Sequence, residues 1–335
     1  CPAAICFSST VIRSAVSRLL LRKWRVFIVR MNEKLEMKPH GGAYRFFNRL
    51  LKCPYILVAP ALITCLVMTV YPMCFGIYLS FHKWDPLTGR KKFVGLNNFK
   101  YLFSSEDFHK VLSNTIIYML VILFVGLFIK ILLGIFLNKR TPIHNLVQTV
   151  VFTPHIISSV SVAVIFMWLM DPKNGGLNMG LRALHLPASN WYLSSDTALL
   201  SVLIVAIWQS CGHGSLLVIA GLRSIPEYLY EAAKLDKSSP VKTFAKITIP
   251  MLSPTLLYMV VTTTASAFTS FDIIKMMTQG GPDNSTNLIA YYVYQQGIMF
   301  NQYGRAMAAA VILLLFTATL SCINFFVLDR RVHYQ

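Results

Sequence analysis

The sequence predicts an all-α membrane protein with six transmembrane helices. Of the 335 residues, 55% are hydrophobic and only 13% are charged, whereas a soluble domain carries about 25% charged residues. Six apolar runs, separated by polar segments, are each long enough to cross a hydrocarbon core of about 30 Å. Composition and hydropathy together therefore exclude an ordinary soluble domain.

The six predicted spans follow the apolar runs in order along the chain. They comprise residues 55–81, 115–137, 146–170, 197–220, 251–274 and 306–328. Pro154 and His155 interrupt the third run near its start. Lys130 lies within the second run, and we expect its ammonium group to reach the nearer membrane interface. The polar segment 82–114 predicts a loop that holds a short surface helix.

The net charge of +18 indicates a membrane topology and not a nucleic-acid partner. Excess Lys and Arg in membrane proteins gather on cytoplasmic segments. With the N-terminus inside, the inner segments hold about twice as many Lys and Arg residues as the outer ones. We therefore expect a multi-pass protein with both termini in the cytoplasm.

Three parts follow from this topology. Residues 1–52 form a basic N-terminal segment, residues 53–328 the six-span domain, and residues 329–335 a cytoplasmic tail. Two readings of residues 1–30 stay open. Either they form a basic amphipathic helix on the membrane surface, or the native protein starts at Met31 and they are no part of it.

The longest polar segment of the second half, residues 225–254, predicts two short helices with a bend. Apolar residues recur at helical spacing from Ile225 to Leu235. Pro240 disfavours the α conformation at Ser239, which ends the first helix. Ser239 is a suitable N-cap for the second helix, with Pro240 at its first position.

A fixed pattern runs through this segment. It consists of Glu231, Ala232, Ala233, Asp236, Phe244, Ile247, Ile249, Pro250 and Pro254. The pattern resembles the EAA loop of binding-protein-dependent ABC importer permeases, over two dozen residues. Lys237 stands where that family has glycine. Either Lys237 adopts a left-handed conformation at a cost of about 1 kcal/mol or more, or Ser239 and Pro240 make the bend.

The resemblance, which covers about residues 53–328, implies the type I ABC importer permease (MetI-like) fold in a bacterial cell membrane. It implies three kinds of partner besides the lipid bilayer: a second homologous permease, two ABC ATPase subunits and an extracytoplasmic solute-binding protein. It also implies a coupling loop, residues 225–250, that contacts the ATPases. The expected coupling residues are Glu231, Ala232, Ala233, Asp236, Lys237, Phe244 and Pro250.

A second signature follows the fifth span. It reads Thr278-Gln279-Gly280-Gly281-Pro282, then Thr286, Tyr291, Tyr294 and Tyr303-Gly304. It resembles the sugar-type (maltose and glycerol-phosphate permease-like) branch of these permeases. The resemblance implies a carbohydrate substrate: a sugar, an oligosaccharide, or a related polyol or glycerol phosphate. The Gly-Gly-Pro core also predicts a tight turn, which would explain the motif without a substrate.

Polar residues within the fourth and fifth spans predict the substrate path, because a polar group in lipid is costly unless it is satisfied. The candidates are Trp208, Gln209, His213, Thr263, Ser266 and Ser270. Aromatic faces, amides and hydroxyls suit a sugar, which has apolar faces and a hydroxyl rim. The alternative is structural, since Ser and Thr bond back to their own helix and Trp marks the membrane interface.

The sequence contains no catalytic constellation. It lacks a Walker phosphate loop, HExxH, GxSxG and a paired CxxC. We therefore expect no enzymatic activity, no catalytic residue, no metal and no cofactor in this chain, with ATP used by partner subunits. The rival function, an ATP-independent secondary transporter or channel, predicts charged relay residues near the midplane of several spans, and few are present.

Overall fold

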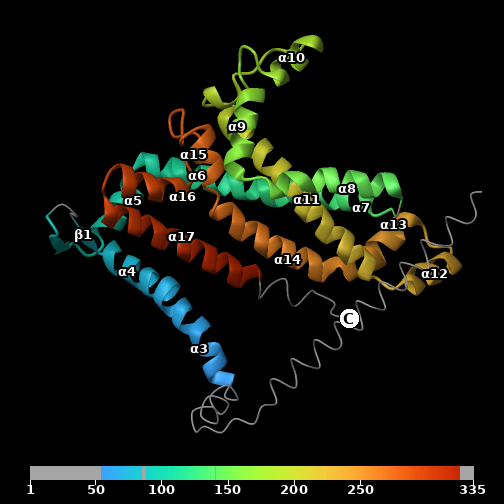
Figure 1. Ribbon diagram of the computed structural model, residues 1–335, viewed down its shortest axis with the longest axis horizontal. Coiled ribbons are helices and arrows are strands. Elements are labelled where there is room, and N and C mark those ends of the chain that lie inside the picture. The colour runs from blue at the N-terminus through green and yellow to red at the C-terminus, as the bar shows by residue number, and fades with distance from the viewer. Residues whose placement is uncertain (1–53, 85–87, 140, 325–335) are drawn as a thin grey trace, which may run out of the picture. The chain divides into compact units, whose positions relative to one another are not determined.

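The computed structural model of the chain describes residues 54–84, 88–139 and 141–324. The expected N-terminal segment, residues 1–52, and the expected tail, residues 329–335, lie outside the described residues. Within the described ranges the regular secondary structure is helical apart from one two-stranded hairpin (Figure 1). This confirms the predicted all-α class.

The first of two compact units, Cys1–Pro72, is helical where it is described. α3 (Pro54–Cys65) contains only apolar residues, a tyrosine, a threonine and a cysteine, and no charge interrupts it. A π-helical turn, η1 (Leu66–Val70), leads into α4 (Tyr71–Ser80). Together these elements supply a candidate membrane span, Val58–Ser80, which confirms the first predicted run.

The second unit, Met73–Gln335, places a hairpin after its first helical residues. β1 (His82–Trp84) pairs antiparallel with β2 (Lys91–Phe93), and α5 (Asn97–Ser104) follows. α5 confirms the short helix predicted within residues 82–114. The hairpin was not expected, because strands of three residues are too short to show an alternating pattern.

Asn98 ties this hairpin to the last helix of the bundle. Its buried side-chain Nδ2 donates hydrogen bonds to the carbonyls of Ser80 (2.7 Å) and His82 (3.1 Å). A Cβ atom on Gly304, in α17 (Tyr303–Ile323), would lie 2.9 Å from the same nitrogen. Glycine at this position therefore permits the close approach of α17.

The second predicted span is longer than the apolar run alone. α6 (Glu106–Val121), a π-helical turn η2 (Ile122–Gly126) and α7 (Leu127–Leu137) form one helix of 32 residues. The helix begins before the apolar run because two acidic residues occupy its first turn, where negative charge is favourable.

The third predicted span is not one straight helix. α8 (Pro142–Ile156) and α9 (Ser159–Leu169) are bent by 103° at the residues between them. Figure 1 shows the two helices running in different directions. Ile157 and Ser158 have extended ψ angles of 140° and 134°, and Pro154 removes an amide donor from the last turn of α8. The described residues thus contain five helices able to span a membrane, or six if this bent pair counts as one span.

The remaining elements complete the bundle. They are α10 (Gly176–Ala183), the 3-10 turn η3 (Trp191–Leu193), α11 (Ala198–Ser224), α12 (Glu227–Leu235), α13 (Pro240–Thr243), the π-helical turn η4 (Phe244–Thr248), α14 (Ile249–Phe268), α15 (Asp272–Met277), α16 (Ile289–Tyr294), the π-helical turn η5 (Gln295–Met299) and α17. α11 packs along α7 and α8 and is the most buried of the candidate spans.

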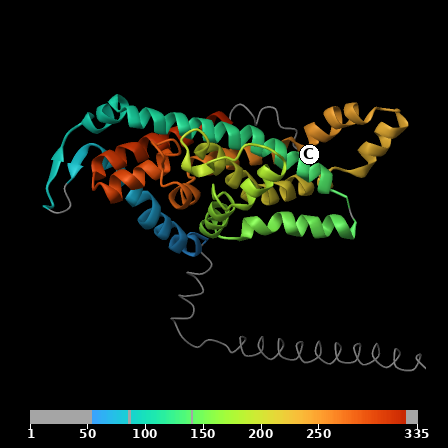
Figure 2. The ribbon, with the colours of Figure 1, turned by 90° about the horizontal axis from the view of Figure 1, so that it is seen from above.

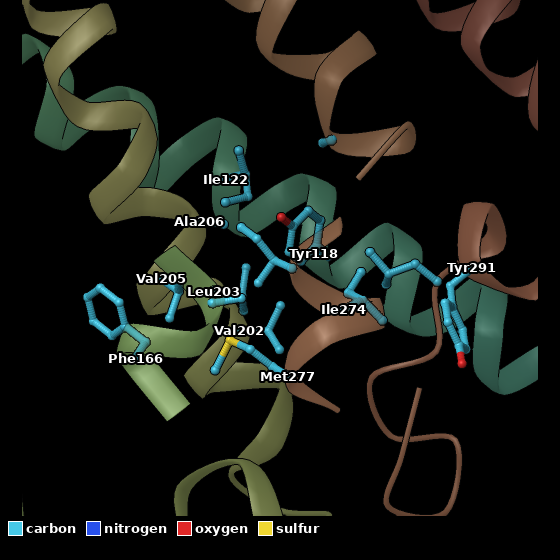
Figure 3. Packing of buried hydrophobic residues seen from close by; sticks show 14 of the residues in the cluster. Tyr118, Ile122, Phe166, Val202, Leu203, Val205, Ala206, Ile274, Met277 and Tyr291 are labelled. Atoms are coloured by element: carbon cyan, nitrogen blue, oxygen red, sulfur yellow. The ribbon is translucent and has the colours of Figure 1, made fainter. Parts of the chain in front are cut away.

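The largest buried cluster joins six helices of this unit, α6, α9, α11, α14, α15 and α16. Val202 and Val205 from α11 share it with Tyr118 of α6, Phe166 of α9 and Ile274 of α15 (Figure 3). α15 is too short to cross a bilayer, so core packing fixes its position.

The predicted Gly-Gly-Pro turn directly follows α15. Gln279 and Gly280 have positive φ angles of 50° and 81°, and the Gly281 amide donates a 2.9 Å hydrogen bond to the Thr278 carbonyl. Thr286 Oγ1 donates to the Thr278 hydroxyl at 2.7 Å and lies 2.9 Å from the Gly281 carbonyl. The tight turn is therefore confirmed.

Candidate functional site

A polar cavity of about 560 Å³ lies within the second unit, between α6–α7, the break between α8 and α9, α11 and α14. Hydroxyls and amides dominate the polar part of its lining. These residues are Tyr118, Ser158, Ser159, Gln209, Ser210, Tyr258, Thr262, Thr263, Ser266, Thr269 and Ser270. A cavity of this size accommodates a small ligand.

The cavity brings together five of the six predicted substrate-path residues. Gln209, His213, Thr263, Ser266 and Ser270 all line it. Their role in binding a substrate stays a prediction.

Trp208, the sixth predicted residue, does not line the cavity and packs against Phe166 of α9. Its indole packs edge-on against the ring of Phe166, with 5.0 Å between the ring centroids. Trp208 is 44% exposed and does not belong to the cavity lining. The structure thus places Trp208 outside the cavity, and the alternative that it marks the membrane interface stays a prediction.

Hydrogen bonds join the cavity walls to one another. Tyr118 Oη and Ser270 Oγ are 2.9 Å apart and link α6 to the segment after α14. Gln209 Nε2 donates to the Ile157 carbonyl and the Ser159 hydroxyl, both at 3.2 Å. The amide of Gln209 therefore satisfies backbone exposed by the break between α8 and α9, and the same residue borders the cavity.

Three basic side chains also line the cavity. His155 and His213 stack with 4.6 Å between their ring centroids and an interplanar angle of 15°. Lys130 is only 5% exposed. The expectation that Lys130 reaches the membrane interface is wrong: it lies against Gly214 of α11, and its side chain borders the cavity.

The predicted coupling loop forms a helical hairpin. α12 ends in a Schellman motif, in which the Ser238 amide bonds to the Ala233 carbonyl (2.9 Å) and the Lys237 amide to the Lys234 carbonyl (3.0 Å). Lys237 has φ = 47°. Of the two alternatives for the bend, Lys237 therefore adopts the left-handed conformation.

Ser239 performs its predicted role in the same loop. Its hydroxyl accepts a hydrogen bond from the Lys242 amide at 3.3 Å, and Pro240 occupies the first turn of α13. The second helix is longer than predicted, because α13, η4 and α14 follow one another without a break. Phe244 lies in η4 and Pro250 in the first turn of α14.

The hairpin of α12 and α13 exposes apolar side chains. It projects beyond the neighbouring ends of α7 and α8, as Figures 1 and 2 show. Leu235 and Val241 are 84% and 78% exposed. Glu231, Ala232 and Asp236 are also exposed, whereas Ala233 is buried.

The base of the hairpin is held firmly. Ile225 is buried in a cluster with Val218, Leu222 and Leu252. Tyr230 of α12 shares a hydrogen bond of 3.1 Å with Thr248, whose side chain is buried where η4 meets α14. The exposed tip therefore stands on a packed base that connects α11, α12 and α14.

No group of three or more His, Cys, Asp or Glu side chains able to hold a metal ion occurs in residues 54–84, 88–139 and 141–324.

A bundle of apolar helices around an open cavity lined partly by hydroxyls and amides suits a membrane transport component. The family described as "Binding-protein-dependent transport system inner membrane component" matches residues 126–334, and this chain belongs to it. The chain is thus a multi-pass permease subunit of a binding-protein-dependent importer. Membership decides against the ATP-independent secondary transporter or channel.

Similar proteins support this assignment. The probable ABC transporter permease protein YurN of Bacillus subtilis is 32% identical, over 80% of this chain and 93% of its own length. The sn-glycerol-3-phosphate transport system permease protein UgpA of Pectobacterium atrosepticum is 30% identical, over 84% of this chain and 96% of its own length.

A solved structure has the same fold. It is a bacterial ABC transporter involved in the import of the acidic polysaccharide alginate. The TM-score is 0.74 at 24% identity, and the match covers 87% of this chain and 99% of that one. This likeness confirms the predicted permease fold.

Proposed function

We propose that this chain imports a carbohydrate and that the loop of residues 225–250 couples it to a pair of ABC ATPase subunits. A second homologous permease would complete the path, and an extracytoplasmic solute-binding protein would deliver the substrate. ATP would be hydrolysed by the ATPase subunits, so this chain would need no cofactor. Both termini and the coupling loop would lie in the cytoplasm.

The carbohydrate assignment is supported by the chemistry of the cavity lining. Its hydroxyls and the Gln209 amide offer donors and acceptors to a polyhydroxylated ligand. Tyr258 offers an aromatic face to the apolar side of a sugar ring. UgpA is named as an sn-glycerol-3-phosphate permease, and the structurally similar transporter imports alginate, so both relatives handle polyol or sugar substrates.

The observation that carries the coupling proposal is the exposed hairpin on a rigid base. Leu235 and Val241 expose apolar surface that a docking groove on another subunit would bury. Glu231 adds a charge for pairing with a basic group. The exposed Ala232 has a side chain small enough to let the partner's backbone approach.

The same hairpin is connected to the cavity through α14. α13, η4 and α14 continue directly from the tip, and α14 carries Thr263 and Ser266 into the cavity wall. A displacement of the hairpin by ATPase closure would therefore move one wall of the substrate path. This is how ATP binding would switch the path between outward- and inward-facing states.

Co-purification tests the proposal directly. The affinity-tagged chain is extracted from membranes in mild detergent, and the proteins bound to it are identified by mass spectrometry. We expect an ABC ATPase and a second permease with the unmodified chain. Glu231→Arg should lose the ATPase and keep the second permease, because only the hairpin contact is changed.

A matched control is Glu106→Arg, the same charge reversal at an exposed residue in the first turn of α6, far from the hairpin in the chain. This variant should retain both partners. If the unmodified chain purifies alone under conditions that preserve such complexes, the coupling proposal is wrong. If Glu231→Arg retains the ATPase as well as Glu106→Arg does, residue 231 lies outside the docking surface.

A further inference from the structure

Lys130 is a lysine buried in the helix bundle, and no side chain in the described part of the chain neutralises its charge. It is 5% exposed within α7, part of a candidate membrane span. Over the ranges that the structure describes, it has no ion pair and no hydrogen bond. An ionisable side chain inside a membrane span is costly, and it normally faces a water-filled cavity or a functional partner.

The fold makes room for this side chain. A Cβ atom at Gly214 would lie 2.6 Å from Lys130 Cγ and closer still to Lys130 Cδ. Every other residue at position 214 would therefore collide with the lysine stem. Gly214 of α11 lets the aliphatic part of Lys130 cross the helix face and reach the cavity.

Basic side chains outnumber carboxylates in the cavity lining. His155 and His213, stacked on each other, line it together with Lys130. Asp272 is the one carboxylate of the lining, and it belongs to α15, beyond the C-terminal end of α14. No other acidic residue borders the cavity to balance Lys130.

From this arrangement we propose that the carbohydrate that passes through the cavity carries an anionic group, a phosphate or a carboxylate, and that Lys130 binds it. The inference rests on the proposed carbohydrate function. A lysine ammonium group is a suitable point charge for either anion, and the hydroxyl-rich wall from Ser158 to Ser270 complements the rest of the ligand. An anionic group would pair with the charge that the described residues leave without a partner.

The charge of the cavity is measured with a reporter cysteine. Ser266→Cys places a thiol on the exposed part of the lining in the full-length chain, purified with its bound subunits. Anionic and cationic methanethiosulfonates of similar size are the probes, and the ratio of their reaction rates is the readout. The same chain without Ser266→Cys gives the background from the seven native cysteines.

Lys130→Met keeps an unbranched side chain of nearly the same length and removes its charge. We expect the anion-to-cation rate ratio to fall roughly five- to tenfold, since one unit charge acts on the probe across a poorly screened cavity. Lys130→Arg should preserve the ratio. Lys139→Met removes a charge from an exposed lysine outside the cavity and should change the ratio by less than about twofold.

Ligand protection needs no substitution at Lys130 and identifies the anion. Glucose 6-phosphate, glucuronate, glucose and inorganic phosphate are compared at equal ionic strength as protectants of the Ser266→Cys thiol. At least one charged sugar should slow its modification several-fold more than glucose does. Protection by glucose 6-phosphate identifies a phosphate, and protection by glucuronate a carboxylate.

Three results would overturn the proposal. They are an unchanged rate ratio in Lys130→Met, equal or no protection by all three sugars, and protection by inorganic phosphate as strong as that by the charged sugars. Equal protection by all three sugars refutes the anionic group alone, whereas no protection by any of them also counts against the carbohydrate substrate. The subunit co-purification depends on Glu231 and not on Lys130, so it reports on coupling whatever the charge of the cavity.

Discussion

Replacing Lys237 with glycine should stabilise the end of α12. Lys237 occupies the left-handed position of the Schellman motif with φ = 47°, where its Cβ crowds the following carbonyl. Glycine removes that crowding and leaves the two hydrogen bonds of the motif in place. The effect is local, because Lys237 is exposed and makes no buried contact.

The size of the effect follows from two opposing terms. A residue with a Cβ atom in the left-handed region costs roughly 1–2 kcal/mol. Glycine loses about 0.5–1 kcal/mol more conformational entropy on ordering. The difference, about 0.5–1 kcal/mol in favour of glycine, corresponds to a two- to fivefold change in the local opening equilibrium.

Hydrogen exchange measured by mass spectrometry detects a change of this size. The amide of Ser238, bonded to the Ala233 carbonyl, should exchange two- to fivefold more slowly in Lys237→Gly than in the unmodified chain, after correction for intrinsic rates. Lys237→Ala removes the charge and keeps the Cβ, so it should show no such slowing. Equal slowing in both variants would assign the effect to charge and refute the argument from backbone strain.

Three further substitutions test packing and hydrogen bonding. Gly212→Ala should prevent correct packing of α11 on α8, because the new Cβ would meet the Val151 carbonyl. The yield of monodisperse protein should therefore fall sharply. Gly180 has open space around it, so the control Gly180→Ala should purify normally. Asn98→Ala should destabilise the hairpin end by about 1–3 kcal/mol, since two backbone carbonyls lose their donor, seen as a lower midpoint in thermal unfolding. Tyr118→Phe should cost about 0.6 kcal/mol, the typical value for a hydrogen bond between membrane helices, and a double-mutant cycle with the partner serine should recover that coupling.

The long apolar runs predict the fold well because lipid imposes one requirement on every span. About 20 apolar residues must form a helix, so five spans appear where the hydropathy places them. The third apolar run does not form one continuous helix. Ile157 and Ser158 have an extended backbone, and the chain bends there by 103°. Pro154 signals an interruption in the sequence, yet the direction of the bend depends on tertiary contacts such as that between Gln209 and the Ile157 carbonyl.

The candidate site is less readable from the sequence than the fold. Hydroxyls and amides in a span identify Gln209 and Thr263, since a polar group in lipid needs a reason. The same rule applied to Lys130 predicts the membrane interface, whereas its side chain lines the cavity. A long side chain can reach either one. Gly214 of α11 was the residue that could have indicated the position of Lys130. A glycine within a span makes room for a side chain of another helix, but one sequence does not show which side chain that is.

The tight contact between α11 and α14 gives α14 the geometry of a lever. A Cβ atom on Gly221 would lie 2.6 Å from Thr255 Oγ1 and 2.7 Å from Leu252 Cδ1, so the two helix axes meet closely there. At 1.5 Å per residue, roughly 22 Å of helix separates Thr255 from Pro240, and roughly 20 Å separates it from Phe268. If the helix pivots at this contact, the segment from Pro240 to Thr255 and the segment from Thr255 to Phe268 are nearly equal in length. A tilt of about 10° therefore moves each end by roughly 3–4 Å, in opposite directions.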